Sequence, residues 1–248
     1  MDDLIKRAAA DLARANRATA LTGAGASIES KIPPFRGKGG LWEKMDPMEV
    51  AHIDAFMRDP AKVWKLLIKD MKDVIDQAQP NDCHKGLARL EALGKLQTVI
   101  TQNIDGLHQM AGNTDVIEFH GTFAWQCCME CDAHIETRRV DVTEIPPLCH
   151  CGGILRPNAV FFGELIPHEA LWRSRQAATD CDIMLVIGTS AMVHPAAMMP
   201  VVAKETGATV IEINPESTPL TGQISNYIIK GPAGETMNRI LAELDELL

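Results

Sequence analysis

The feature of this sequence that most constrains its fold is an alternation of short apolar segments with helical segments. The apolar segments are rich in β-branched residues and occupy residues 18–22, 96–102, 116–121, 183–190, 209–215 and 226–231. Segments with helical periodicity occupy residues 1–18, 62–75, 84–95, 194–207 and 235–248. Strands that alternate with helices build parallel sheets covered by helices on both faces. The sequence therefore predicts an α/β fold with a Rossmann-like parallel sheet.

Length and charge narrow the class of protein. The 248 residues suit one large core with a smaller inserted module. The formal net charge of −9 disfavours a direct nucleic-acid binder, because contacts with phosphates need a surplus of Lys and Arg. No apolar run approaches the roughly 18 residues of a membrane-spanning helix, and the charged N-terminal helix lacks the apolar centre of a signal peptide. We therefore expect a cytoplasmic protein without a membrane partner, whose cysteines are thiols or metal ligands.

A glycine-rich turn directly follows the first predicted strand. Residues 23–27 read GAGAS, and a turn of this kind after a strand can cradle a phosphate with its backbone N–H groups. The fingerprint of dinucleotide-binding dehydrogenases has a third glycine where this chain has Ile28. The prolines at 33–34 also prevent a long helix from starting here, so a dehydrogenase is disfavoured. The chain instead enters a loop with Phe35 and Arg36, a candidate cover for a bound cofactor.

Four cysteines in the middle of the chain have the spacing of a zinc ribbon. The two pairs are Cys128 with Cys131 and Cys149 with Cys151, and 17 residues separate them. Two close thiolate pairs supply the four soft ligands of a tetrahedral zinc ion and leave no open position for water, so we predict a structural zinc site. Because the second pair is one residue tighter than usual, Cys127 and His150 remain alternative ligands.

Polar residues follow several predicted strands at the point where each strand ends. Open α/β sheets bind ligands beyond the carboxyl ends of their strands, so these residues are candidates for one dinucleotide site. Gln102, Asn103 and Asp105 have side chains that can hold a carboxamide. His120 follows another apolar segment, where an imidazole can act as a general base near neutral pH. Two further strand ends supply candidate phosphate and ribose ligands, namely Gly188, Thr189, Ser190, Asn214 and Glu216.

Taken together, these segments resemble the sirtuin family, the NAD-dependent protein-lysine deacylases, from about residue 15 to residue 240. The matching segments, in the family's order, read GAGAS, FRGKGGLW, TQNIDGLH, EFHG, the paired cysteines, LRPNAVFFGE, GTS and INPE. The resemblance implies that NAD is a co-substrate and that no hydride is transferred. The acyl-lysine carbonyl oxygen would attack the nicotinamide ribose, and His120 would then deprotonate a ribose hydroxyl. The products would be nicotinamide, the deacylated protein and O-acyl-ADP-ribose.

The resemblance also implies a role for each matching residue. The cofactor-binding residues would be Gly23, Ala24, Gly25, Ser27, Ile32, Phe35, Arg36, Gln102, Asn103, Asp105, Gly188, Thr189, Ser190, Asn214 and Glu216. His120 and Asn103 would be catalytic. Acyl-lysine proteins would bind as an added strand, mainly through backbone hydrogen bonds. The residues for this strand would be Val160, Phe161, Phe162, Gly163 and Glu164.

The same resemblance implies a division of the chain. The Rossmann-like NAD-binding domain would contain residues 1–35, 81–123 and 156–248. A smaller lobe would contain the cofactor loop and a helical part at 36–80, and the zinc-binding module at 124–155.

Acyl specificity is expected to differ from that of family members that remove succinyl or malonyl groups. Those members carry Tyr and Arg three and six residues after a helical Trp, which here is Trp64, whereas this chain has Leu67 and Asp70. An aspartate repels a carboxylate and cannot form the arginine fork. We expect poor removal of succinyl groups and tolerance of uncharged acyl groups.

Two other functions compete with deacylation. Protein mono-ADP-ribosyl transfer breaks the same bond in NAD but uses an amino-acid side chain as acceptor. A non-catalytic NAD sensor with a nucleic-acid-binding zinc ribbon is a second alternative. The cysteine-rich module is not strongly basic, which disfavours this sensor.

Overall fold

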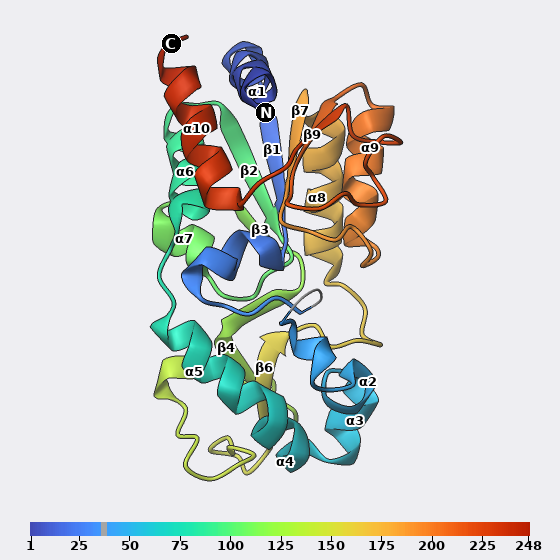
Figure 1. Ribbon diagram of the computed structural model, residues 1–248. Helices are drawn as coiled ribbons and strands as arrows, with labels where there is room; N and C mark the ends of the chain where they lie inside the picture. Colours follow the sequence, from blue (N-terminus) through green and yellow to red (C-terminus); the bar gives the residue numbers. More distant parts are fainter. Residues whose placement is uncertain (36–38) are drawn as a thin grey trace.

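The computed structural model describes residues 1–35 and 39–248, and within these ranges it has a large and a small lobe (Figure 1). The large lobe is built on a six-stranded sheet in which every pair of neighbouring strands is parallel. In spatial order the strands are β3 (Val116–Glu118), β2 (Leu96–Thr101), β1 (Ala18–Thr22), β7 (Ile183–Ile187), β8 (Thr209–Ile213) and β9 (Tyr227–Ile229). The direction of strand addition reverses between β1 and β7, so a ligand crevice is expected beyond their carboxyl ends.

Helices cover both faces of this sheet. One face carries α1 (Asp2–Arg14), α6 (Asp82–Ala92) and α10 (Ala233–Asp245), and the other carries α8 (His168–Asp180) and α9 (Met199–Glu205). Alternate residues of β7 enter the two cores: Leu185 packs with the first group of helices and Val186 with the second. Because both faces are covered, all five residues of β1 and of β7 are buried.

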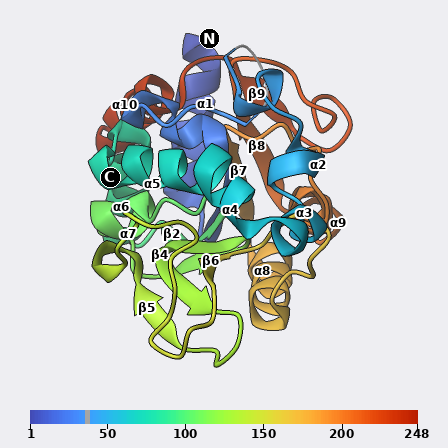
Figure 2. The same cartoon turned by 90° about the horizontal axis from the view of Figure 1, so that it is seen from below.

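The small lobe combines a helical part with an antiparallel sheet, and Figure 2 shows the sheet from below. Its helices are α2 (Pro47–Val50), α3 (Ile53–Arg58), α4 (Pro60–Val63) and α5 (Lys69–Gln77), with a π-helical turn at Trp64–Ile68 between the last two. Its sheet has the order β5 (His134–Glu136), β4 (Gly121–Cys128) and β6 (Leu155–Ala159). The indole nitrogen of Trp64 donates to the carbonyl oxygen of Leu155 at 2.9 Å, which joins the two parts.

The expected fold class is confirmed: a Rossmann-like parallel sheet with helices on both faces and a smaller lobe with a cysteine cluster. The antiparallel sheet extends over 121–159 and so includes a few residues on either side of the expected module at 124–155. Pro47 and Pro60 each begin a helix, and each is preceded by an aspartate that caps the helix. The sequence analysis missed α8 and the short α7 (Leu107–Ala111).

The remaining short elements are 3-10 turns at Ala24–Ser30, Leu41–Glu43, Thr137–Arg139 and Ala196–Met198. Among the helices of the described ranges, none combines the length and the apolar character that a membrane crossing requires.

Candidate active site

A cavity of about 820 Å³ lies at the carboxyl ends of the central strands, where the large lobe meets the small one. Its volume is within the range of roughly 300–1,000 Å³ that is common for ligand sites. A smaller cavity of about 90 Å³ shares several wall residues with it. The predicted residues that line the large cavity are Gly23, Ala24, Gly25, Phe35, Gln102, Asn103, His120, Val160, Phe161, Phe162, Gly163, Glu164, Gly188, Thr189, Ser190, Asn214 and Glu216. Ser27, Ile32 and Asp105 line the small cavity.

The glycine turn after β1 is packed directly against the end of β7. The N–H group of Gly25 donates to the carbonyl oxygen of Gly188 at 2.7 Å, and a Cβ atom on Gly25 would lie 2.6 Å from the Cα atom of Gly188. Gly188 has φ +60°, a conformation that favours glycine. In a dehydrogenase the third glycine allows close packing next to the turn. Here Gly188, which directly follows β7, allows close packing against the turn at Gly25. The turn then continues as the 3-10 helix Ala24–Ser30 rather than as a long helix. The two glycines are thus required for the contact between the turn and the end of β7, and the turn itself lines the large cavity.

Asn103, Ser27 and Asp105 form one hydrogen-bonded cluster beneath the turn. The side-chain amide of Asn103 donates to the carbonyl oxygen of Gly23 and to the hydroxyl of Ser27, both at 3.0 Å. The Ser27 hydroxyl in turn donates to a carboxylate oxygen of Asp105 at 2.7 Å, and the Leu107 N–H group binds the other oxygen at 3.0 Å. Ser27 is only 1% exposed. Its hydroxyl proton is therefore used to orient Asp105, while Asn103 and Asp105 contribute to the walls of the small cavity.

Two buried histidines, His84 and His108, support this cluster from behind. Their rings lie 4.7 Å apart between centroids, and the Nε2 atom of His84 is 3.4 Å from the Ser27 hydroxyl. Burial lowers the pKa of His84 to about 4 and that of His108 to about 3. Both rings are consequently neutral at physiological pH. A neutral pair leaves Asp105 as the only charge in the cluster.

His120 lies in the turn between β3 and β4, two residues beyond the end of β3. Its Nδ1 atom is 3.0 Å from the carbonyl oxygen of Gln102. A carbonyl oxygen can only accept a hydrogen bond, so Nδ1 carries the proton and Nε2 keeps its lone pair. Burial lowers the pKa of His120, and the Gln102 carbonyl opposes this only in part. The neutral ring has the tautomer that a general base needs.

A second set of contacts ties the ends of β2, β7 and β8 together. The Gln102 amide donates to the Thr189 hydroxyl at 3.0 Å, and the Asn214 amide donates to the Thr189 carbonyl oxygen at 2.8 Å. Beneath the following loop, the fully buried carboxylate of Glu212 accepts hydrogen bonds from Ser225 at 2.6 Å and from two threonines, Thr218 and Thr221. Glu212 thereby holds the loop that places Glu216 in the cavity wall.

Residues 160–164 form the wall that the small lobe contributes. The N–H group of Val160 donates to the carbonyl oxygen of His120 at 2.9 Å, so this segment is tied directly to His120. The N–H and carbonyl groups of Phe162 pair with Ala51 and Ile53, both at 2.9 Å. One edge of the segment is therefore already paired at Phe162, and on the opposite edge the N–H and carbonyl groups of Phe161 are both bound by Glu164.

The expected cofactor cover is described in part. Phe35 lines both cavities and stacks on Trp42, with ring centroids 5.3 Å apart. The rings of Trp42 and Phe162 lie 6.4 Å apart between centroids. Three aromatic rings in contact therefore connect this loop to the 160–164 segment. Ile32 contributes to the small cavity only. Arg36 lies outside the described residues.

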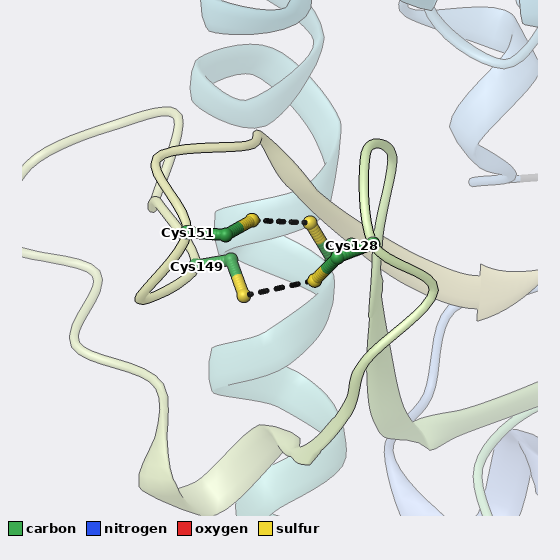
Figure 3. A group of neighbouring side chains, drawn as sticks. Cys128, Cys149 and Cys151 are labelled. Carbon is green, nitrogen blue, oxygen red and sulfur yellow. Dashed lines mark hydrogen bonds between the residues drawn. The ribbon is translucent and has the colours of Figure 1, made fainter.

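The four cysteines predicted as metal ligands form one cluster (Figure 3). All four sulfur atoms lie within 4.8 Å of one another. The Cys128–Cys151 and Cys131–Cys149 sulfur pairs are 3.5 and 3.8 Å apart. Four sulfurs at about 2.3 Å from a tetrahedral zinc ion are about 3.8 Å apart, so the cluster fits structural zinc. Of the two alternative ligands, His150 places Nδ1 3.3 Å from the Cys149 sulfur, but neither His150 nor Cys127 belongs to the cluster.

Several residues around the site were not singled out as functional by the sequence. His84 and His108 lie in helices, α6 and α7, and so lack the strand-end position that drew attention to His120. His84 had one local signal, since Asn81 and His84 form a capping box at the start of α6. Glu212 alternates with apolar residues in a buried strand, and its polar partners follow only later in the chain.

Comparison with known proteins agrees with this geometry. The Sir2 family model matches residues 23–195. The chain is 46% identical over 239 residues to NAD-dependent protein deacylase 2 of Pyrobaculum aerophilum. The aligned region covers 96% of this chain and 94% of the relative. It is similar to a solved Sir2 homolog–NAD complex, with a TM-score of 0.88 and 42% identity over 100% of this chain and 94% of the other. It is also similar to a Sir2 variant with a deacetylated p53 peptide and 3′-O-acetyl ADP-ribose, with a TM-score of 0.91 and 34% identity over 96% and 98% of the two chains. The resemblance seen in the sequence is thus confirmed, and this chain belongs to the Sir2 family.

Proposed function

We propose that this chain is an NAD-dependent protein-lysine deacylase that transfers the acyl group of a modified lysine to the ADP-ribose part of NAD. The observation that carries the proposal is the environment of His120. Its ring lines the same cavity as the glycine turn and the 160–164 segment, and its Nδ1 atom is held by the Gln102 carbonyl. The deacylase relative and the solved complexes with NAD and with a deacetylated peptide support the same reaction.

Each part of the cavity has a proposed task. When bound, NAD supplies the ribose that accepts the acyl group and nicotinamide as the leaving group, and one water molecule is consumed for each lysine amine released. Gly23, Ala24 and Gly25 of the turn line the part of the cavity that would hold the diphosphate, and Asn214 and Glu216 line the part that would hold the adenosine side. Asp105, oriented by Ser27, accepts from the nicotinamide carboxamide.

His120 is the proposed general base. Its Nε2 atom takes the proton of a ribose hydroxyl, because Nδ1 is already occupied by its hydrogen bond to Gln102. Asn103 keeps the small cavity in shape through its bonds to Gly23 and Ser27. The acyl-lysine segment of the substrate protein would add beside residues 160–164 as an extra strand. Zinc in the four-cysteine cluster would stabilise the module that carries β6.

The test of this function is incubation of the zinc-loaded protein with NAD and an acetyl-lysine peptide, followed by mass spectrometry of all products. We expect nicotinamide, free lysine peptide and O-acetyl-ADP-ribose in equal amounts. Nicotinamide together with an ADP-ribosylated protein, and no free lysine, would instead indicate ADP-ribosyl transfer. No cleavage of NAD would contradict the proposal.

Acyl preference is a further expected property of this site. Leu67 is 6% exposed and lines both cavities, while the exposed Asp70 lines the small one. We expect acetyl-lysine and longer uncharged acyl-lysine peptides to be turned over, and kcat/KM for a succinyl peptide to be at least about 10-fold lower because Asp70 repels its carboxylate. Steady-state kinetics on matched peptides measure this difference.

Asp70→Asn is the matched variant for this prediction. It removes the charge without changing the size of the side chain, so it should improve turnover of the succinyl peptide and leave that of the acetyl peptide unchanged. A higher kcat/KM of the unmodified protein for the succinyl peptide than for the acetyl peptide would contradict this prediction.

A further inference from the structure

Both oxygens of the Glu164 carboxylate accept hydrogen bonds from other groups of the protein. Its Oε1 and Oε2 atoms accept hydrogen bonds from the two terminal nitrogens of Arg156 at 2.6 and 2.7 Å. Oε2 also accepts from the N–H group of Phe161 at 2.8 Å. Burial raises the pKa of Glu164, but the bonds from Arg156 and Phe161 outweigh it and lower the pKa below its ordinary value. This side chain is therefore ionised and already has its partners before any peptide binds.

The guanidinium of Arg156 holds the segment at several points. Besides its two bonds to Glu164, it donates to the carbonyl oxygen of Ala159 at 2.8 Å. It also lies 4.6 Å from the centre of the Phe161 ring. The Arg156 side chain is 11% exposed and that of Glu164 is 25% exposed, so solvent screens this pair less than a surface ion pair. A single planar group thus connects both ends of the turn at 159–164.

The turn held in this way forms part of the cavity wall. Phe161 is 8% exposed, lines the large cavity and packs on Phe56 with ring centroids 5.4 Å apart. The Glu164 N–H group bonds back to the Phe161 carbonyl at 3.1 Å, and Gly163 has φ +88°. Since Phe162 is paired on one edge and Phe161 is bound by Glu164 on the other, the turn decides which of the remaining backbone groups of residues 160–164 a peptide can reach.

We propose that Arg156 and Glu164 form a clamp that positions residues 160–164 for the acyl-lysine peptide, which makes both of them positioning residues rather than substrate ligands. This inference rests on the proposed function, because the bound segment is taken to be an acyl-lysine peptide. The clamp is anchored in the cysteine module. Arg156 of β6 pairs with Cys127 of β4, and the preceding residue, Leu155, pairs with Cys128.

The clamp is tested by measuring peptide affinity and NAD affinity separately. We expect Glu164→Gln, which keeps the size of the side chain, to weaken binding of a fluorescent acetyl-lysine peptide by about 10-fold or more, as expected for loss of hydrogen bonds to a charged group. The NAD affinity should change by less than about 2-fold, since among the described residues neither Arg156 nor Glu164 has a hydrogen bond to the glycine turn. In steady-state kinetics the same variant should raise KM for the peptide and leave KM for NAD unchanged.

Arg156→Lys is the second variant and carries the test if Glu164→Gln does not fold. Lysine keeps the charge but lacks the planar fork, so this variant should also bind the peptide more weakly than the unmodified protein. Glu136→Gln, which removes the carboxylate of an ion pair with the exposed Arg138 in the same lobe, is the matched control and should leave peptide affinity unchanged.

Two outcomes would overturn the clamp. The first is native peptide affinity in Glu164→Gln or in Arg156→Lys. The second is an equal loss of peptide and NAD affinity, which would indicate a general structural role. Because peptide binding is measured without turnover, an unmodified protein that binds the peptide but does not deacylate it would count against the proposed function and not against the clamp.

Discussion

Replacement of His120 by alanine is expected to lower the rate of deacylation by ~10²–10⁴-fold, the usual cost of removing a general base. The physical reason is the fixed tautomer. The Gln102 carbonyl holds the proton on Nδ1 at 3.0 Å, so Nε2 is the nitrogen that can accept a proton. Alanine leaves the other groups of the cavity wall in place, and NAD affinity measured by calorimetry should remain close to that of the unmodified protein.

His168→Ala is the matched control for this experiment. His168 is an exposed histidine at the start of α8 and lines neither of the two cavities described above. Its loss should leave both the rate and the NAD affinity unchanged. A His120→Ala protein that retains more than about one tenth of the native rate would exclude His120 as the general base.

The pH dependence of the rate is an independent test of His120 as the general base. Only neutral imidazole can accept a proton, so activity should be fully present above the pKa of His120 and should fall as the pH drops through it. Because burial lowers this pKa, the acidic fall in kcat/KM should lie below the ordinary histidine value of 6.5. The residual activity of His120→Ala should lack this fall.

Removal of the metal from the four-cysteine cluster is expected to abolish activity by unfolding the cysteine module. A structural zinc site contributes its binding free energy to folding, so chelation or loss of one thiolate releases the segments that the ion joins. Leu155 of β6 pairs with Cys128, and β6 leads directly into residues 156–164. We therefore expect Cys128→Ser to lose the metal, to unfold at a lower temperature and to lose peptide binding.

Cys127→Ser is the matched control, because Cys127 is the adjacent cysteine and lies outside the cluster. It should keep one zinc ion per chain by elemental analysis and a native unfolding temperature. His150→Ala tests the remaining alternative ligand, whose Nδ1 atom is 3.3 Å from the Cys149 sulfur. Full zinc content in Cys128→Ser, or its loss in either control, would show that the four-cysteine assignment is incorrect.

Much of the fold could be predicted because its signals are local. The buried strands at 18–22 and 183–187 are short runs of mostly apolar or β-branched residues, and a sheet covered on both faces requires such runs. The ligand spacing of the cysteine module is equally local. Proline was harder to interpret: Pro60 ends one helix pattern and starts the next, and only the cap from Asp59 distinguishes the two roles.

The candidate site was predicted as a set of strand ends, and the parallel sheet explains why. Parallel strands present their carboxyl ends at one edge, so residues that follow different strands meet there although they are far apart in the chain. The sequence did not show which hydrogen-bond partner each polar group has. Ser27 was a candidate phosphate donor, but its hydroxyl donates to Asp105, 78 residues away. Glu164 was a candidate substrate ligand, but Arg156 and Phe161 already bind its carboxylate.

The sequence by itself determined the parallel sheet and the inserted cysteine module, because periodicity and ligand spacing act over a few residues, and its resemblance to the sirtuin family supplied many of the residues expected around the crevice. Only the tertiary structure decided that Gly188 packs against Gly25, that Gln102 fixes the tautomer of His120, and that Arg156 closes the turn at Glu164. These choices depend on which donors and acceptors meet once the two lobes are folded. A hydrogen bond has one direction and few partners, and no local pattern states which partner will be within reach.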